Sequence, residues 1–335
     1  MAKKLTDRWN WRLAGAAAAA ALALVTASGA TFADAAPEAA HHHPGPLPGF
    51  RDGYVENDGI RIHYVVGGHG PALVLLHGWP ETWQAWSGIA PQLAQDHTVI
   101  AVDLRGLGDS QPAPSDAPGS YAALTLATDV HAVTQQLGLQ KIDLAGHDVG
   151  GGVALAYAAE YRDQVDKLAI LEAPPTTAYL NFVQTKSDYL WWDAMVNGPQ
   201  GDMAEQLVAG REKVFYSAVY AGPAGGKGGT ISPETVKRYI EAYSRPGSTH
   251  AGFEFFRQQD VGERAVQDLI DENGKLTIPV LGVGGQYSMN SEVGDDTGKL
   301  AATNVTTVVV PNANHWVMEE QPQFVTNLLS GFFKS

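Results

Sequence analysis

The stretch Ala145-Gly146-His147-Asp148-Val149-Gly150-Gly151 decides how the rest of the chain is interpreted. A short apolar run typical of a strand, residues 142–145, leads into it, and an alanine-rich pattern typical of a helix, residues 153–161, follows it. Glycines have no Cβ atom, so they let a strand and a helix meet in a sharp turn whose central residue is strained. Such a turn presents its central residue, here Asp148, as a nucleophile.

Asp148 stands where many hydrolytic enzymes with this turn carry a serine. A carboxylate is ionised at neutral pH and needs no base before it attacks. It can displace a leaving group from a saturated carbon and form an alkyl-enzyme ester. The alternative is that Asp148 only caps the following helix by accepting its free N–H groups. The rest of the chain favours the nucleophile.

The N-terminus predicts a leader that is removed. Four basic residues within the first twelve precede an apolar run over residues 13–25, and Ala33-Asp34-Ala35 supplies the small residues of a cleavage site. The apolar run is shorter than the roughly 20 residues that span a bilayer. We therefore expect a signal peptide over residues 1–35, an exported (periplasmic or secreted) protein, and no membrane insertion after cleavage.

The segment after the leader, residues 36–50, is rich in proline and contains His41-His42-His43. Three histidines can bind a transition metal, but a flexible, solvated tail is the interpretation that we favour. We expect no functional metal here.

Composition limits the class of protein. The net charge is −14, and cleavage after Ala35 would take it to −16, which disfavours nucleic acid or anionic membrane as a partner. The chain has no cysteine, so disulfides do not contribute to its stability. Hydrophobic residues make up 44% of the chain, enough for one domain with an inserted segment.

Strand and helix patterns alternate along most of the chain, which predicts an α/β fold with a mostly parallel, eight-stranded sheet and helices on both faces. We expect an amphipathic helix ending at Ala94 and core segments at residues 51–173 and 277–335. Residues 174–276 break the alternation, are rich in aromatic residues, and are expected to form an inserted helical cap. Clear strand patterns cover residues 54–56, 60–66, 72–76, 98–102, 142–145, 168–171, 279–283 and 305–310.

His315 follows the last expected strand, within reach of the sharp turn in this topology, and is the candidate general base. A carboxylate has to orient such a histidine. The usual place for it is the loop at residues 284–288, which contains no acid. Glu172, at the end of the strand that follows the turn, is the favoured alternative, with Glu292 and Asp295 also open.

The stretch His77-Gly78-Trp79-Pro80 is expected to line the same site. The backbone N–H groups of Trp79 and Val149 are the candidate oxyanion hole, and a cis peptide before the proline fits such a turn. We expect structural roles for the first histidine of this stretch and for His147. Residues 103–110 are also expected to form a structural turn bridged by an Arg/Asp pair.

Together, the segments 77–81 and 146–150 and the pair His315-Trp316 resemble the α/β-hydrolase superfamily, in particular its epoxide hydrolase and dehalogenase branch with an Asp nucleophile. The resemblance runs from about residue 54 to residue 333. The leader and the segments 171–174 and 253–257 are similar to the secreted bacterial epoxide hydrolases of that branch. The resemblance implies a hydrolase with no cofactor and makes Glu172 the third member of its triad.

The cap departs from the family pattern. Epoxide opening needs an acid from the cap, and the family uses two tyrosines or a histidine and a tyrosine. The second position falls at Phe256, which has no hydroxyl, and the first falls near Tyr189, Trp192 or Asp193. Trp191 and Trp192 would also suit a halide, as in dehalogenases.

The sequence therefore predicts an exported hydrolase that opens epoxides to diols through an ester on Asp148. The alternatives are a haloalkane or haloacetate dehalogenase with the same triad, and a catalytically weak binding protein of this fold. Against the dehalogenase, Val149 stands where a Trp or Arg often follows the nucleophile. The expected partner is a small hydrophobic epoxide or halide, and a homodimer is left open.

Overall fold

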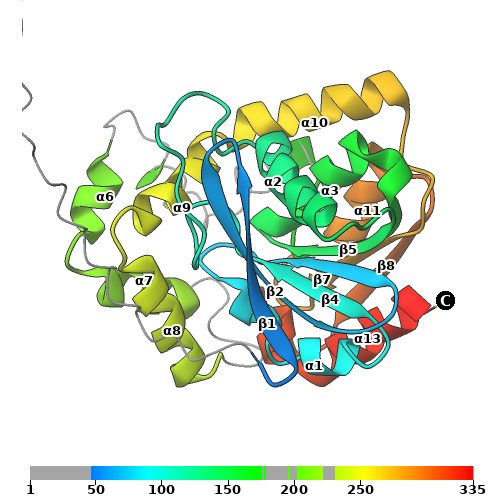
Figure 1. The fold of residues 1–335 in the computed structure, drawn as a ribbon, viewed down its shortest axis with the longest axis horizontal. Coiled ribbons are helices and arrows are strands. Elements are labelled where there is room, and N and C mark those ends of the chain that lie inside the picture. Colours follow the sequence, from blue (N-terminus) through cyan, green and yellow to red (C-terminus); the bar gives the residue numbers. More distant parts are fainter. Residues whose placement is uncertain (1–46, 176, 179–194, 197–201, 222–230, 335) are drawn as a thin grey trace, which may run out of the picture. The chain divides into compact units, whose positions relative to one another are not determined.

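The computed structural model describes residues 47–175, 177–178, 195–196, 202–221 and 231–334. Within them, eight strands form one sheet in the order β1-β2-β4-β3-β5-β6-β7-β8 (Figure 1). The β1–β2 and β2–β4 pairs are antiparallel and all other neighbours are parallel, which confirms the expected sheet. The strands are β1 (Phe50–Asn57), β2 (Ile60–Gly68), β3 (Ala72–Leu76), β4 (Thr98–Val102), β5 (Ile142–His147), β6 (Val165–Leu171), β7 (Val280–Gly285) and β8 (Val305–Val310).

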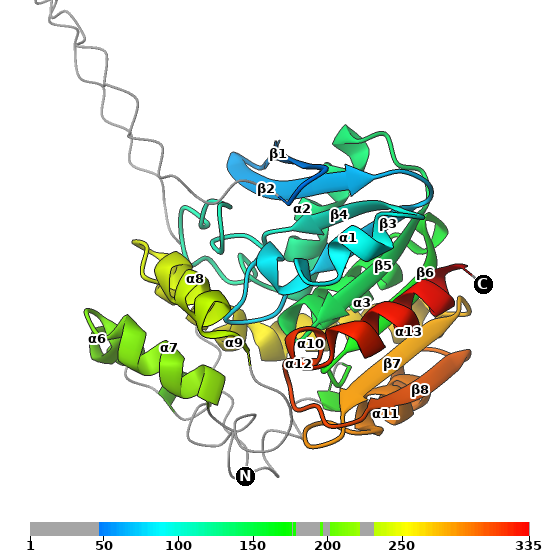
Figure 2. The same ribbon diagram turned by 90° about the horizontal axis from the view of Figure 1, so that it is seen from below.

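Helices cover both faces of this sheet (Figures 1 and 2). Strand β3 shows why, because its side chains alternate between two cores: Leu73 and Leu75 belong to one, Val74 and Leu76 to the other. The core of Val74 is covered by α2 (Ala123–Gln136), α3 (Val149–Glu160), α10 (Gln259–Asn273) and α11 (Glu292–Leu300). The core of Leu73 is covered by α1 (Ala90–Leu93), α12 (Val317–Glu320) and α13 (Pro322–Lys334).

The prediction of a single amphipathic helix ending at Ala94 is wrong. The segment forms a short 3-10 helix, η1 (Trp83–Trp86), followed by the one-turn helix α1. The Thr82 hydroxyl accepts the N–H of Gln84 at the start of η1. Gly88 and Pro91 then interrupt the segment, because glycine is a poor helix former and proline is tolerated only in a first turn.

Between β6 and β7 the described chain is helical, with α6 (Met203–Val208), α7 (Glu212–Ala221), α8 (Pro233–Tyr243) and α9 (Ser248–Arg257) before α10. Helix α10 packs against α2 and α3. Two tyrosine hydroxyls from α7 and α8 donate to carbonyl oxygens of the loop after β3: Tyr220 to Pro80, and Tyr243 to Glu81 at 3.0 Å. These helices are therefore bonded directly to the loop that carries the candidate oxyanion donor.

The predicted signal peptide and most of the histidine-containing tail, residues 1–46, lie outside the described residues. In the part of the chain that is described, no helix combines the length and apolar character needed to cross a bilayer.

Candidate active site

Asp148 sits on the sharp turn between β5 and α3. Its backbone adopts φ 48° and ψ −123°, a conformation that costs a non-glycine residue energy and is concentrated at functional sites. The Asp148 N–H donates to the carbonyl of Leu171 at 2.9 Å, which anchors the turn to β6. A Cβ at Gly146 would lie 2.1 Å from the carbonyl oxygen of Gly150, so the turn requires the glycine that the sequence places there.

The side chain of Asp148 does not cap α3, although its residue occupies the N-cap position. Its Oδ1 instead accepts the backbone N–H of Trp79 at 2.9 Å, and its side chain is 14% exposed. The alternative in which this carboxylate only caps the helix is therefore wrong.

The structure brings His315 to this carboxylate. Its Nε2 lies 3.6 Å from Oδ2 of Asp148, and its Nδ1 lies 3.0 Å from Oε2 of Glu172. Because a carboxylate accepts, Nδ1 carries the proton in this arrangement and Nε2 is left to face Asp148. Residues from the ends of β5 and β6 and from the loop after β8 thus meet at one place.

Glu172 is fully buried and also has a positive φ, 52°. The N–H of Gly285 donates to its Oε1, and the hydroxyl of Ser288 donates to its Oε2 at 2.6 Å. The end of β7 and the loop after it, which contain no acid, therefore each supply a hydrogen-bond donor to Glu172. The other two candidates, Glu292 and Asp295, are exposed on α11.

The two expected oxyanion donors are at the site. The Trp79–Pro80 peptide bond is cis, as expected, and the Trp79 N–H already contacts Asp148. Val149 is the first residue of α3, so the helix does not use its N–H. A Cβ at Gly78 would lie 2.6 Å from Cβ of Asp148, which leaves only glycine at that position.

His77 fixes the peptide that carries the Trp79 N–H. Its Nε2 accepts the N–H of Leu104 at 3.0 Å, so its Nδ1 carries the proton and donates to the carbonyl of Gly78 at 2.7 Å. Burial lowers the pKa of His77, which agrees with a neutral ring. The expected structural role of this side chain thus has a specific form: it orients one peptide of the candidate oxyanion hole.

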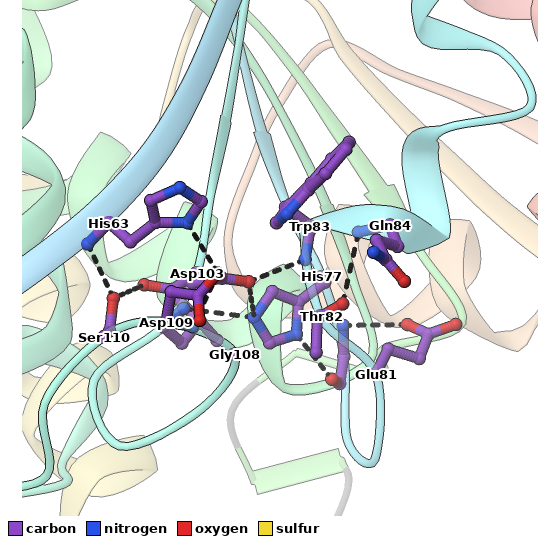
Figure 3. Close-up of polar contacts among 12 residues, drawn as sticks. His63, His77, Glu81, Thr82, Trp83, Gln84, Asp103, Gly108, Asp109 and Ser110 are labelled. Carbon is purple, nitrogen blue, oxygen red and sulfur yellow. Dashed lines mark hydrogen bonds and ion pairs between the residues drawn. The ribbon is translucent and has the colours of Figure 1, made fainter. Parts of the chain in front are cut away.

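Asp103 lies between His63 and His77 (Figure 3). It accepts from His63 Nδ1 at 2.7 Å and from the N–H of Trp83 at 2.8 Å. Ligand atoms of His63, Asp103 and Asp109 lie within 4.8 Å of one another, as in a metal site. Asp103 also accepts the N–H of Asp109 at 3.0 Å, and Asp109 pairs with Arg245 at 2.8 Å, so we assign the cluster a structural role.

The prediction that an Arg/Asp pair bridges residues 103–110 is wrong. Arg105 forms a buried, two-pronged pair with Asp129 of α2, with both N–O distances 2.8 Å. Planar guanidinium groups favour such a bidentate partner. Arg105 therefore ties the loop to a helix, while the bridges within the loop come from Asp103, which accepts the N–H of Asp109 at 3.0 Å and, at its carbonyl, the hydroxyl of Ser110 at 2.7 Å.

A cavity opens beside Asp148. Phe256 lines it, and its ring meets that of Trp79 edge-on with centroids 5.2 Å apart. Tyr189, Trp191, Trp192 and Asp193 lie outside the described residues. Sequence reasoning missed three polar residues of the cavity wall, which α10 and the segment before α2 supply: Tyr121, Gln259 and Glu263.

The sequence profile of the α/β hydrolase fold family matches residues 71–322. The chain belongs to this family. It is similar to a soluble epoxide hydrolase of Corynebacterium sp. (strain C12), 34% identical over 286 residues that cover 82% of this chain and 94% of that protein. It is 30% identical to a fluoroacetate dehalogenase of Burkholderia sp over 203 residues, 60% of this chain and 67% of that protein.

Among solved structures, the Cif epoxide hydrolase from Acinetobacter nosocomialis superposes with a TM-score of 0.78 at 26% identity, covering 86% of this chain and 90% of that one. These likenesses place this α/β hydrolase in the epoxide hydrolase and dehalogenase branch of the family.

Proposed function

We propose that the protein hydrolyses epoxides to diols. The observation that supports this most directly is the placement of Asp148 between two partners: Oδ1 on the Trp79 N–H at 2.9 Å and Oδ2 at 3.6 Å from His315 Nε2. Oδ2 is then the oxygen that attacks an epoxide carbon. A C–O bond forms to Asp148, the ring C–O bond breaks, and the leaving oxygen takes a proton from an acid.

Ester hydrolysis follows at the same carboxyl group. His315, oriented by Glu172, takes a proton from water at Nε2 as the water oxygen adds to Cγ of Asp148. The Trp79 and Val149 N–H groups stabilise the charge that develops on Oδ1. The bond from Cγ to Oδ2 then breaks, and the diol oxygen receives the proton from His315. The carboxyl group that forms from Oδ1 and the water oxygen releases its remaining proton to solvent, and solvent returns a proton to the acid used in ring opening, so the carboxylate and the acid are both restored.

The acid that protonates the leaving oxygen is open to two assignments. Phe256 has no hydroxyl, and among the described residues that line the cavity only Tyr121 has one. Tyr121 is 2% exposed and its oxygen accepts the N–H of Ala113 at 3.0 Å, which leaves its own proton to donate. We propose Tyr121 as the acid, with a cap hydroxyl such as that of Tyr189 as the alternative.

The charge of the cavity favours neutral epoxides over haloacetates. Asp148, Glu172 and Glu263 contribute three carboxyl groups to the described lining, which contains no lysine or arginine. An anionic substrate would therefore meet like charges in a partly dehydrated site. Aromatic and aliphatic walls, including Phe255 and Phe256, suit a small hydrophobic molecule.

The N-terminal segment supports export as part of this proposal. A basic start, an apolar run and a small-residue cleavage site at residues 33–35 are the features of a signal peptide. We propose that the protein acts as a periplasmic or secreted enzyme after cleavage near Ala35.

Product analysis with matched substrates tests the proposal. Wild-type protein should convert styrene oxide to its diol, and Asp148→Asn, which keeps the size of the side chain, should not. Release of halide from 1-bromobutane or bromoacetate without diol formation from epoxides would instead establish a dehalogenase. Turnover of neither class would favour the binding protein.

A further inference from the structure

A charged pair is buried directly beneath the candidate site. His147, the last residue of β5, and Glu81, in the loop after β3, both have fully buried side chains. Nδ1 of His147 lies 2.8 Å from Oε2 of Glu81. The same oxygen accepts the N–H of Gly78 at 2.9 Å, and Nε2 of His147 lies 2.8 Å from the carbonyl oxygen of His315.

These bonds determine where the protons are. A carbonyl oxygen only accepts, so Nε2 of His147 carries a proton. Oε2 of Glu81 already accepts the Gly78 N–H and faces Nδ1 as a carboxylate oxygen, so Nδ1 carries a proton as well. Burial would raise the pKa of the Glu81 carboxyl group, but the charge and hydrogen bond of His147 lower it, so Glu81 is ionised and the ring is an imidazolium. Burial would lower the pKa of His147, but the charge and hydrogen bond of Glu81 outweigh it and raise this pKa to about 10.

The pair connects the three segments that form the site. Gly78 precedes Trp79, whose N–H holds Asp148; His147 precedes Asp148 itself; and the carbonyl that His147 binds belongs to His315. The rings of His147 and His315 also lie against each other, with centroids 4.8 Å apart. Figure 3 shows Glu81 in the same loop as His77, whose Nδ1 donates to the Gly78 carbonyl at 2.7 Å.

We propose that Glu81 and His147 are positioning residues for ester hydrolysis, because their ion pair holds the backbone of His315 and the His77–Gly78 peptide, which directly precedes the peptide carrying the Trp79 N–H, in register with Asp148. This inference rests on the proposed function. The pair would then support one of the two chemical steps rather than the fold in general.

The two steps depend on the pair to different extents. Alkylation uses Oδ2 of Asp148, whose backbone is also anchored by the Leu171 carbonyl at 2.9 Å. Hydrolysis additionally needs His315 at the correct distance from a water and the Trp79 N–H on the developing oxyanion. A misplacement of about 1 Å can cost roughly 10²-fold in rate, so loss of the pair should slow hydrolysis more than alkylation.

The test uses the complete chain that follows the predicted signal peptide, as wild type and as the variants Glu81→Gln and His147→Gln. Because either change leaves one buried charge alone, the double variant Glu81→Gln/His147→Gln, which is neutral at both positions, is measured beside them. The matched control is Asp129→Asn, which breaks a different buried pair, Arg105–Asp129, in the loop and helix described above. Thermal melts verify folding, and the amount of Asp148 ester formed counts the competent sites.

Single-turnover reactions with styrene oxide separate the steps by the mass of the Asp148 peptide. We expect hydrolysis about 10²-fold slower in the pair variants, alkylation within a few-fold of wild type, and therefore accumulated ester. The control should keep the wild-type ratio of the two rates. Equal losses in both steps, unchanged hydrolysis, or the same ester accumulation in Asp129→Asn would overturn the inference. If wild type and His315→Gln both fail to form ester or diol, the proposed function itself fails.

Discussion

Nδ1 of His315 lies 3.0 Å from Oε2 of Glu172, and this acid comes from the end of β6 rather than from the loop after β7. The last residue of β7, Gly285, contributes its N–H to the same carboxylate, and the loop contributes the Ser288 hydroxyl. The acid and its support have thus been divided between two adjacent parallel strands. Their carboxyl ends meet at one edge of the sheet, so either strand can present a residue to His315.

Glu172→Gln should slow ester hydrolysis by roughly 10²- to 10⁴-fold, because an amide leaves the imidazole without its orienting carboxylate. Ser288→Ala removes only one of the bonds to that carboxylate and should cost about tenfold. Single-turnover hydrolysis rates check both values. A larger loss in Ser288→Ala than in Glu172→Gln would contradict the assignment of the acid.

Gly78→Ala should abolish most of the activity, because the new Cβ would lie 2.6 Å from Cβ and 3.0 Å from Oδ1 of Asp148. Gly88→Ala is the matched control in the same loop region, since a Cβ there meets nothing within 4 Å. Diol formation and thermal melts are compared for the two variants. Retained activity in Gly78→Ala would show that Asp148 is placed differently.

Tyr121→Phe should slow the opening of styrene oxide while leaving the displacement of bromide from 1-bromobutane unchanged. An epoxide oxygen leaves as an alkoxide and needs a proton, whereas a halide leaves as a stable anion. A change in cavity shape would affect both substrates, so the difference between the two rate changes reports only the missing proton donor. Equal changes with both substrates would favour a cap hydroxyl as the acid.

Glu263→Gln should improve turnover of an epoxide that carries a carboxylate, relative to styrene oxide. The substitution removes one of three carboxyl groups from the described cavity lining. We expect the ratio of kcat/KM values for the two epoxides to rise by about tenfold, because one like charge at the edge of the site is removed. An unchanged ratio would mean that this carboxyl group does not face the substrate.

Stability should fall as pH rises from neutral to about 9. Burial alone would lower the pKa of His63, but the hydrogen bond and charge of Asp103 and the bond to Asp52 raise it from 6.5 to about 9. Between these two pKa values the folded state binds a proton that the unfolded chain has released. The contribution of His63 to the free energy of unfolding is therefore complete below pH 6.5 and is lost as pH passes 9. Urea unfolding of wild type should show this slope, and His63→Gln should reduce it without removing it, because Glu81 raises the pKa of His147 to about 10 and that histidine contributes a slope of the same sign. Parallel pH profiles would contradict the role of His63.

Much of the site could be predicted from local sequence. Asp148 stands between glycines at the end of an apolar run, and His315 follows the last strand pattern. Such features depend on neighbours a few residues away, where backbone sterics decide the structure. Glu172 was inferred by elimination together with the family resemblance, and the structure places its carboxylate on His315.

The long-range partners could not be predicted in this way. Glu81 and His147 are 66 residues apart, and Glu172 and Ser288 are 116 apart. Many buried carboxylates and histidines could form such pairs, and only the register of β3, β5, β6 and β7 selects among them. For the same reason the sequence pairs Arg105 with an aspartate of its own loop, whereas its partner in the structure is Asp129 on α2.

Trapping the ester on Asp148 is the most direct test of the proposed chemistry. His315→Gln removes the base that activates water but leaves the nucleophile and the Trp79 N–H in place. After incubation with styrene oxide, the peptide that carries Asp148 should gain the mass of one substrate molecule, and no diol should be released. An unmodified Asp148 peptide in this variant, with diol still formed by wild type, would contradict a carboxylate nucleophile at this position.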